Sequence, residues 1–185
     1  MKIFAVYFKI KLTKKPNWFD EFRDKFKGTF ILHITLIQSR YADEAEIAPV
    51  KAKITEVLRG QHFSEEDKNM IFDEFVSSLE SDGKYAYMLM AKRNDRLMAF
   101  QRALQDALKG YERYCDETTR EYEVNFKPHL TLGNGVTLDQ RAEADTYFSS
   151  DYACEGRVTD LVLPVVKDTT PEEANNSANL TGFKI

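Results

Sequence analysis

The stretch FKPHLTLG, residues 126–133, has a partner earlier in the chain, because its centre His129–Leu132 follows the same pattern as His33–Leu36. Each tetrapeptide is a histidine, an aliphatic residue, a threonine and a leucine. The chain has three histidines, and His62 lies outside both motifs. From ordinary residue usage, threonine and leucine should follow a given histidine at this spacing in roughly one case in a few hundred. A lone histidine on a strand is usually a packed or surface residue, but two matching motifs indicate a shared function.

Strand geometry places the polar residues of each motif on one face. Residues i and i+2 of a strand point to the same side, about 7 Å apart, and the residues between them point to the other side. His33 therefore shares a face with Thr35, and His129 shares a face with Thr131. The opposite faces carry only aliphatic side chains, namely Leu32, Ile34, Leu36, Leu130 and Leu132. We expect the aliphatic faces to anchor both strands on a core while the polar pairs face a cleft.

Around the first motif, the apolar residues alternate with a period of two in some segments and recur at helical spacing in others. Pro16 precedes aromatic residues at helical spacing, and Gly28 supplies a stop. These patterns predict strands at 2–12 and 30–38 and helices at 16–27 and about 43–60. The polar, acidic stretch 61–83 is interpreted as one or two edge strands or a long connection.

The second motif has similar surroundings. Asp95 can cap a helix, Thr137 with Gln140 resembles a capping box, and residues 133–135 are typical of a turn. The patterns predict strands at 84–91, 124–132, 157–166 and 180–185, helices at about 95–111 and 137–148, and a turn or loop at 168–178.

Both halves of the chain thus follow the order strand, helix, strand with a histidine motif, helix, strand, as a duplicated unit would. No glycine-rich phosphate loop follows a strand, which argues against a doubly wound parallel sheet. The sequence predicts an α+β fold with two lobes of antiparallel sheet in a single domain over residues 1–185. The lobes are expected at about residues 1–60 and 84–167, with one His-x-Thr motif each.

The composition is that of an ordinary globular protein. The 185 residues are 43% hydrophobic, and 26 basic against 30 acidic side chains give a net charge of −4. Proteins that bind long duplex nucleic acid usually carry a strongly basic face, so we expect a short ligand if nucleic acid is bound. No apolar run approaches the roughly eighteen residues of a membrane span, and the apolar start lacks a signal cleavage site. These features predict a cytoplasmic monomer without a membrane partner.

The two cysteines, Cys115 and Cys154, are expected to be reduced, because they form no disulfide framework and lack C-x-x-C spacing. A structural zinc site would need four ligands, and the cysteines and His62 are scattered without ligand spacing. No G-x-S-x-G motif is present, and neither cysteine has a histidine nearby in sequence. No metal and no cofactor are expected.

Two histidines that face one cleft can cleave a phosphodiester without a metal. An imidazole with a pKa of about 6.5 can give or take a proton close to neutral pH. One histidine would remove a proton from the attacking oxygen, and the other would protonate the leaving oxygen. Threonine hydroxyls can donate hydrogen bonds to the non-bridging phosphate oxygens. The candidate catalytic residues are therefore His33 and His129, and the candidate phosphate-binding residues are Thr35 and Thr131.

The paired His-x-Thr motifs and their separation resemble the signature of the 2H phosphoesterase superfamily. Residues 126–133 in particular resemble the second motif of its 2'-5' RNA ligase and cyclic phosphodiesterase branch. The resemblance implies two lobes related by a pseudo-twofold axis, each giving one motif to a central cleft. It also implies a metal-independent hydrolase that acts on 2',3'-cyclic phosphates or on 2'-5'-linked nucleotides and RNA ends. The segment 65–82 is acidic, so a small nucleotide or short RNA is expected rather than structured tRNA.

Two alternatives use the same cleft. A nucleotide or RNA-end binding module could act as a sensor, with binding but no turnover. RNA ligation is the reverse of 2'-5' hydrolysis and could use the same residues.

Several other side chains near the motifs are candidate ligand contacts. Arg40 and Lys127 could meet phosphate, but charged residues beside strands are usually solvated, so both are left out of the site. Aromatic residues near the motifs could stack on a base, although core packing is their commoner role. These residues are Phe8, Tyr85, Tyr87 and Phe126.

Overall fold

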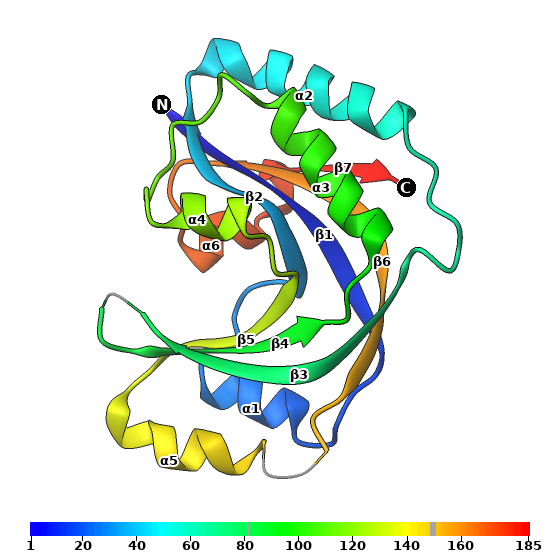
Figure 1. The fold of residues 1–185 in the computed structure, drawn as a ribbon. Helices are drawn as coiled ribbons and strands as arrows, with labels where there is room; N and C mark the ends of the chain where they lie inside the picture. Colours follow the sequence, from blue (N-terminus) through cyan, green and yellow to red (C-terminus); the bar gives the residue numbers. More distant parts are fainter. Residues whose placement is uncertain (81, 149–150) are drawn as a thin grey trace.

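The computed structural model describes residues 1–80, 82–148 and 151–185. Its framework is a seven-stranded antiparallel sheet in the order β2-β1-β6-β3-β4-β5, with β7 paired to β6 (Figure 1). The strands are β1 (Lys2–Lys14), β2 (His33–Ala42), β3 (Asn69–Leu79), β4 (Tyr85–Ala91), β5 (His129–Val136), β6 (Cys154–Val166) and β7 (Leu180–Lys184). The helices are α1 (Phe19–Lys25), α2 (Glu44–Arg59), α3 (Asp95–Ala107), α4 (Thr119–Val124), α5 (Leu138–Thr146) and α6 (Pro171–Asn175). This mixed α/β architecture confirms the predicted fold class.

The duplicated order of elements is confirmed, and the two repeats exchange their last strands. The two repeats are β1-α1-β2-α2-β3 and β4-α3-β5-α5-β6, with the short α4 inserted before β5. The last strand of each repeat crosses to the other half of the sheet, because β3 pairs with β4 and β6 pairs with β1. The lobes at about residues 1–60 and 84–167 stay a prediction, with β3 between these bounds and β6 inside the second. Pairing partners are long-range, so hydrophobic periodicity alone could not reveal this exchange.

The third strand, β3, joins the two halves of the sheet rather than lying at an edge. Residues 69–72 pair with β6, and residues 72–79 pair with β4. In this strand Met70 and Phe72 are buried, whereas Asp73 and Glu74 are exposed. The exposed acidic residues explain why the sequence of this segment is polar. The acidic middle of the chain therefore contributes an internal strand with one solvated stretch.

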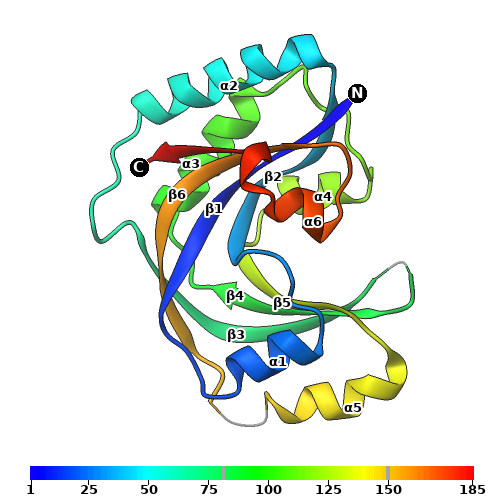
Figure 2. The same ribbon diagram turned by 180° about the vertical axis from the view of Figure 1, so that it is seen from behind.

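The helices also exchange between the halves. Helix α1, which follows β1, packs against β5, whereas α3, which follows β4, packs against β2 and α2 (Figures 1 and 2). Phe22 of α1 is fully buried, and its ring contacts Tyr87 of β4 and Phe148 after α5 at centroid distances of 5.5 and 5.1 Å. On the other side, Phe8 stacks on Phe100 of α3 at 5.4 Å. Burial of such aromatic side chains stabilises each half by roughly 1.5–3 kcal/mol per residue.

The predicted turn at residues 133–135 is instead part of β5, and its glycines have a packing role. A Cβ on Gly133 would lie 2.5 Å from the carbonyl oxygen of Phe26, so glycine allows the end of α1 to pack directly on β5. Gly135 has a φ of +77° beside the register shift between β4 and β5. The glycines therefore allow close approach and a bulge rather than a chain reversal.

Other predicted boundaries shift by a few residues. Helix α1 begins at Phe19, three residues after Pro16, and β2 begins at His33. Helix α3 is capped by Asn94, whose side chain accepts a hydrogen bond from the amide of Leu97, rather than by Asp95. The predicted loop 168–178 contains α6. The cap at Thr137 with Gln140 is confirmed.

Cys115 and Cys154 are free thiols, as expected, and Cys154 is fully buried. Within residues 1–80, 82–148 and 151–185, none of the helices has the length and apolar character needed to cross a membrane.

Candidate active site

The two histidine motifs lie on strands that are brought together by the curl of the sheet. Strands β2 and β5 stand at opposite ends of the strand order, yet they lie beside one another (Figures 1 and 2). The alternation along each strand is as predicted. The aliphatic residues Ile34, Leu36, Leu130 and Leu132 are buried, whereas the histidines and threonines between them are partly exposed. Each strand is thus anchored by one face, and its polar pair lies on the other.

The two histidines make the same hydrogen bond. Nδ1 of His33 donates to the carbonyl of Ile31 at 2.6 Å, and Nδ1 of His129 donates to the carbonyl of Lys127 at 2.8 Å. A carbonyl oxygen can only accept, so the proton must lie on Nδ1 in each ring. Nε2 of each neutral ring then carries the lone pair that can take up a proton. The backbone two residues earlier therefore sets the tautomer of both rings.

The electrostatic surroundings favour the neutral form of both rings. Burial lowers the pKa of His33, the carbonyl of Ile31 raises it in part, and the charges of His129 and Arg23 lower it further. Burial also lowers the pKa of His129, while the carbonyl of Lys127 and the carboxylate of Glu80 raise it. Both rings therefore lose a bound proton more readily than a free imidazole does.

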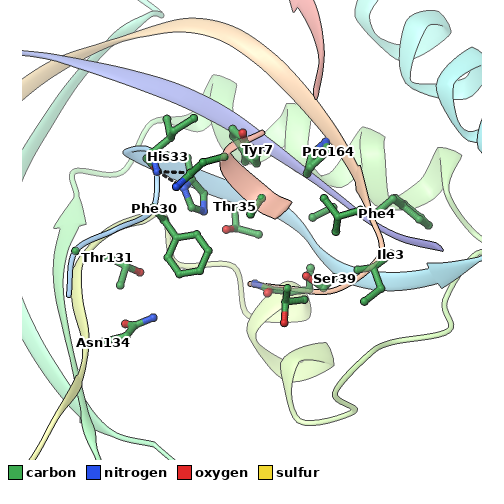
Figure 3. A pocket seen from close by; sticks show the side chains of 18 of the residues that line it. Ile3, Phe4, Tyr7, Phe30, His33, Thr35, Ser39, Thr131, Asn134 and Pro164 are labelled. Atoms are coloured by element: carbon green, nitrogen blue, oxygen red, sulfur yellow. Dashed lines mark hydrogen bonds between the residues drawn. The ribbon is translucent and has the colours of Figure 1, made fainter. Parts of the chain in front are cut away.

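A cavity of about 250 Å³ lies beside His33. Both threonines, Thr35 from β2 and Thr131 from β5, line it together with Asn134 (Figure 3). His129 is not among its lining residues, although its charge acts on His33. The structure thus brings His33, Thr35 and Thr131 to one cavity, with His129 on the facing strand beside it.

The cavity extends from His33 along β1 and β2. Its lining is largely apolar, with Ile3 and Tyr7 from β1 and Pro164 from β6 (Figure 3). Of the described residues that line the cavity, Lys27 is the single one of the four charged types lysine, arginine, aspartate and glutamate. The cavity therefore suits a compact group of low charge next to His33.

Two aromatic residues at this site, Tyr7 and Phe30, are not among the site residues predicted from the sequence. The Tyr7 ring lies 4.6 Å from the His33 ring, and Phe30 lines the cavity. Tyr7 pairs with Thr35 across β1 and β2, so only the register of the two strands reveals its position. Two of the aromatic candidates for base stacking, Phe8 and Tyr87, are fully buried in the core and are not available to a ligand. Both rings therefore pack in the hydrophobic core, the commoner role for aromatic side chains.

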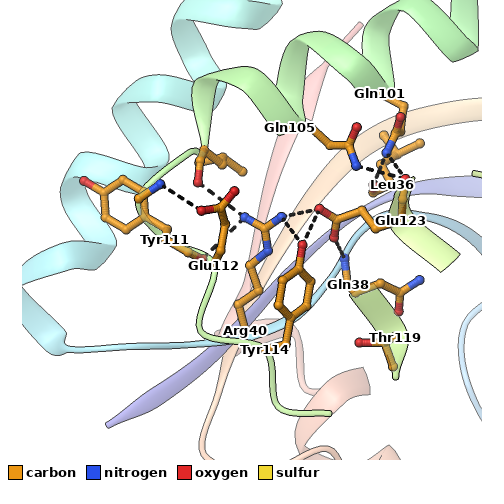
Figure 4. Close-up of polar contacts among 12 residues, drawn as sticks. Leu36, Gln38, Arg40, Gln101, Gln105, Tyr111, Glu112, Tyr114, Thr119 and Glu123 are labelled. Carbon is orange, nitrogen blue, oxygen red and sulfur yellow. Dashed lines mark hydrogen bonds and ion pairs between the residues drawn. The ribbon is translucent and has the colours of Figure 1, made fainter. Parts of the chain in front are cut away.

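The two charged residues near the motifs have structural roles. Arg40 is not solvated, as its sequence context suggested, but is 1% exposed and paired with Glu123 of α4 (Figure 4). The side chain of Lys127 is exposed, and its backbone carbonyl holds His129. Neither side chain lines the cavity beside His33.

Comparison with known proteins identifies the family and a similar fold. A family model described as the 2'-5' RNA ligase superfamily matches residues 13–169, a span that includes both motifs. The solved structure of Usb1 from Kluyveromyces marxianus is similar with a TM-score of 0.53 and 10% sequence identity, over 99% of this chain and 98% of that chain. At this identity the likeness concerns the fold alone. No curated protein matches the sequence.

Proposed function

Because the chain belongs to the 2'-5' RNA ligase superfamily, whose members act on phosphoesters, we propose that it is a metal-independent phosphodiesterase of the 2H type. The proposed substrates are small nucleotides or RNA ends that carry a 2',3'-cyclic phosphate or a 2'-5' linkage. His33 and His129 act as the acid/base pair, and Thr35 and Thr131 bind the phosphate.

The observation that carries this proposal is the matched pair of Nδ1–carbonyl hydrogen bonds on facing strands. A general base needs a free Nε2 lone pair to meet the substrate, and a proton held on Nδ1 by a backbone carbonyl leaves that lone pair free. The same arrangement occurs twice, with a threonine beside each ring.

The proposed hydrolysis is an attack of water on phosphorus. Nε2 of one histidine takes a proton from the water as its oxygen bonds to phosphorus, and Nε2–H of the other protonates the departing sugar oxygen as its bond to phosphorus breaks. The hydroxyls of Thr35 and Thr131 donate to the non-bridging oxygens, where negative charge accumulates. Both hydroxyls border the cavity beside His33, which supports a phosphate at that end and a nucleoside in the apolar part.

A substrate panel tests the proposal. We expect the purified protein in EDTA to convert 2',3'-cyclic nucleotides or 2'-5'-linked oligoadenylate, with products separated by chromatography. The same reactions with added Mg²⁺ should run at an unchanged rate. Activity that depends on Mg²⁺ would contradict the mechanism. Saturable binding without product would support the sensor function instead, and joining of RNA ends would show the ligase direction.

The pH dependence of kcat/KM follows from the histidine environments. The base must be neutral and the acid protonated, so the active population is largest between the two pKa values of the free enzyme. Burial lowers the pKa of both rings from the ordinary value of 6.5. We therefore expect a bell-shaped kcat/KM profile with its maximum on the acidic side of this value. A kcat/KM that rises steadily from acidic to alkaline pH would contradict the paired roles.

A further inference from the structure

The segment Lys27–Ile31, here called the strap, joins α1 to β2 and leads directly into the first motif. Its last carbonyl, that of Ile31, accepts the Nδ1–H of His33 at 2.6 Å. The strap also lines the cavity through residues 27, 28, 30 and 31. The orientation and tautomer of the His33 ring therefore depend on where the strap places one carbonyl group.

On one side, α1 and β5 hold the strap. The guanidinium of Arg23 donates through Nη2 to the carbonyls of Gly28 and Phe30, the second at 2.6 Å. Gly28 packs so closely on β5 that a Cβ would lie 2.3 Å from the carbonyl oxygen of Leu132. These contacts fix the beginning and the middle of the strap.

On the other side, Asn175 at the end of α6 holds the part nearest to His33. Its Nδ2 donates to the carbonyl of Thr29 at 2.8 Å, and its Oδ1 accepts from the amide of Ile31 at 3.2 Å. One carboxamide thus pairs with two backbone groups as a neighbouring strand would. The hydrogen bond to Ile31 leaves the carbonyl of the same residue directed at the His33 ring.

Helix α6 is itself held in place, so Asn175 is positioned before any ligand binds. The side chain of Thr170 caps the helix by accepting from the amide of Glu173. Asn179 donates to the carbonyl and the carboxylate of Glu173 at 3.0 and 3.1 Å. Asn175 also lines the cavity beside His33.

We propose that Asn175 is a positioning residue for His33, acting through the strap to hold the Nδ1–H tautomer that leaves Nε2 free for proton transfer. It lies outside residues 13–169, the span that the family model matches. The role in turnover rests on the function proposed above, but the effect on the His33 ring does not. The two can therefore be tested separately.

The test combines imidazole ¹⁵N NMR with kinetics on the full chain. In Asn175→Ala, the His33 nitrogens should shift from the Nδ1–H pattern toward a mixture of tautomers, while those of His129 stay unchanged. The value of kcat should fall by about 10- to 100-fold with KM nearly constant, as when the partner that orients a functional histidine is removed. Asn176→Ala is the matched control, because the side chain of Asn176 caps the turn after α6 by accepting from the amide of Ala178.

A second variant keeps the test decisive if the alanine variant folds poorly. Asn175→Asp retains an acceptor for the Ile31 amide and loses the donor to Thr29, so a smaller shift of the His33 signals in the same direction is expected. Unchanged His33 signals in both variants would overturn the proposal, and so would equal changes at His33 and His129. A wild-type protein without turnover would refute the proposed function and leave the NMR test intact.

Discussion

Replacement of either His33 or His129 by alanine is expected to lower kcat by about 10²- to 10⁴-fold, the contribution typical of one general acid or base. Each substitution removes an Nε2 that the mechanism requires and leaves the threonines in place. KM should change much less, because the proposed phosphate contacts of Thr35 and Thr131 remain. Steady-state and single-turnover rates on whichever substrate the wild type converts give this measurement.

The third histidine provides a control for these variants. His62 lies outside both motifs and outside the cavity lining, so His62→Ala should retain wild-type turnover. The kcat of the double variant His33→Ala/His129→Ala should be only slightly below that of the less active single variant. The reason is that the effects of groups that act as a unit are strongly non-additive. If one single variant keeps its activity while the other loses it, the histidine replaced in the active variant is not an acid or base.

The local part of the site follows from the sequence because it depends on strand periodicity. The exposure of His33 and Thr35 on one face and the burial of Ile34 and Leu36 on the other need only a period of two and an aliphatic anchor. The capping box at Thr137 is equally local. Such features are encoded within a few neighbouring residues, so a single sequence is sufficient to predict them.

The rest of the site depends on contacts between distant segments. Tyr7 reaches His33 through the register of β1 and β2, and Asn175 reaches the strap from a helix of five residues. A helix this short has no hydrophobic period to detect, and its small polar residues are also typical of a loop. The crossing of β3 and β6 has the same origin, since no local pattern specifies which strand is the partner. Sequence reasoning therefore predicts which motif residues share a face but misses the distant residues that surround them.

The buried ion pair between Arg40 and Glu123 is the second feature with a large expected effect. Both side chains are 1% exposed, and one Glu123 oxygen, Oε1, also accepts from the hydroxyl of Tyr114 at 3.1 Å (Figure 4). The other oxygen, Oε2, accepts from the backbone amide of Gln38 at 2.8 Å. Because β2 ends the strand order, Glu123 supplies a partner for a backbone group at the sheet edge. Gln38 also lines the cavity, so this network supports one of its walls.

Loss of the Glu123 charge should be far more costly than loss of an exposed charge. Glu123→Gln leaves the Arg40 guanidinium buried without a counter-charge, so we expect the free energy of unfolding to fall by about 3–5 kcal/mol. Urea unfolding with linear extrapolation measures this, and an unchanged m-value shows that the transition is the same. Asp20→Asn, which breaks the exposed pair with Lys15, should cost less than about 1 kcal/mol.

The double variant Arg40→Met/Glu123→Leu separates the penalty of an unpaired charge from the worth of the pair. Apolar residues of similar volume often replace a buried ion pair at little cost, so the double variant should recover most of the stability lost in Glu123→Gln. An equally unstable double variant would show instead that the hydrogen bonds to Gln38 and Tyr114 stabilise this edge of the sheet. Stability close to wild type in Glu123→Gln would contradict the charge explanation, because a buried guanidinium without its carboxylate would then carry no penalty.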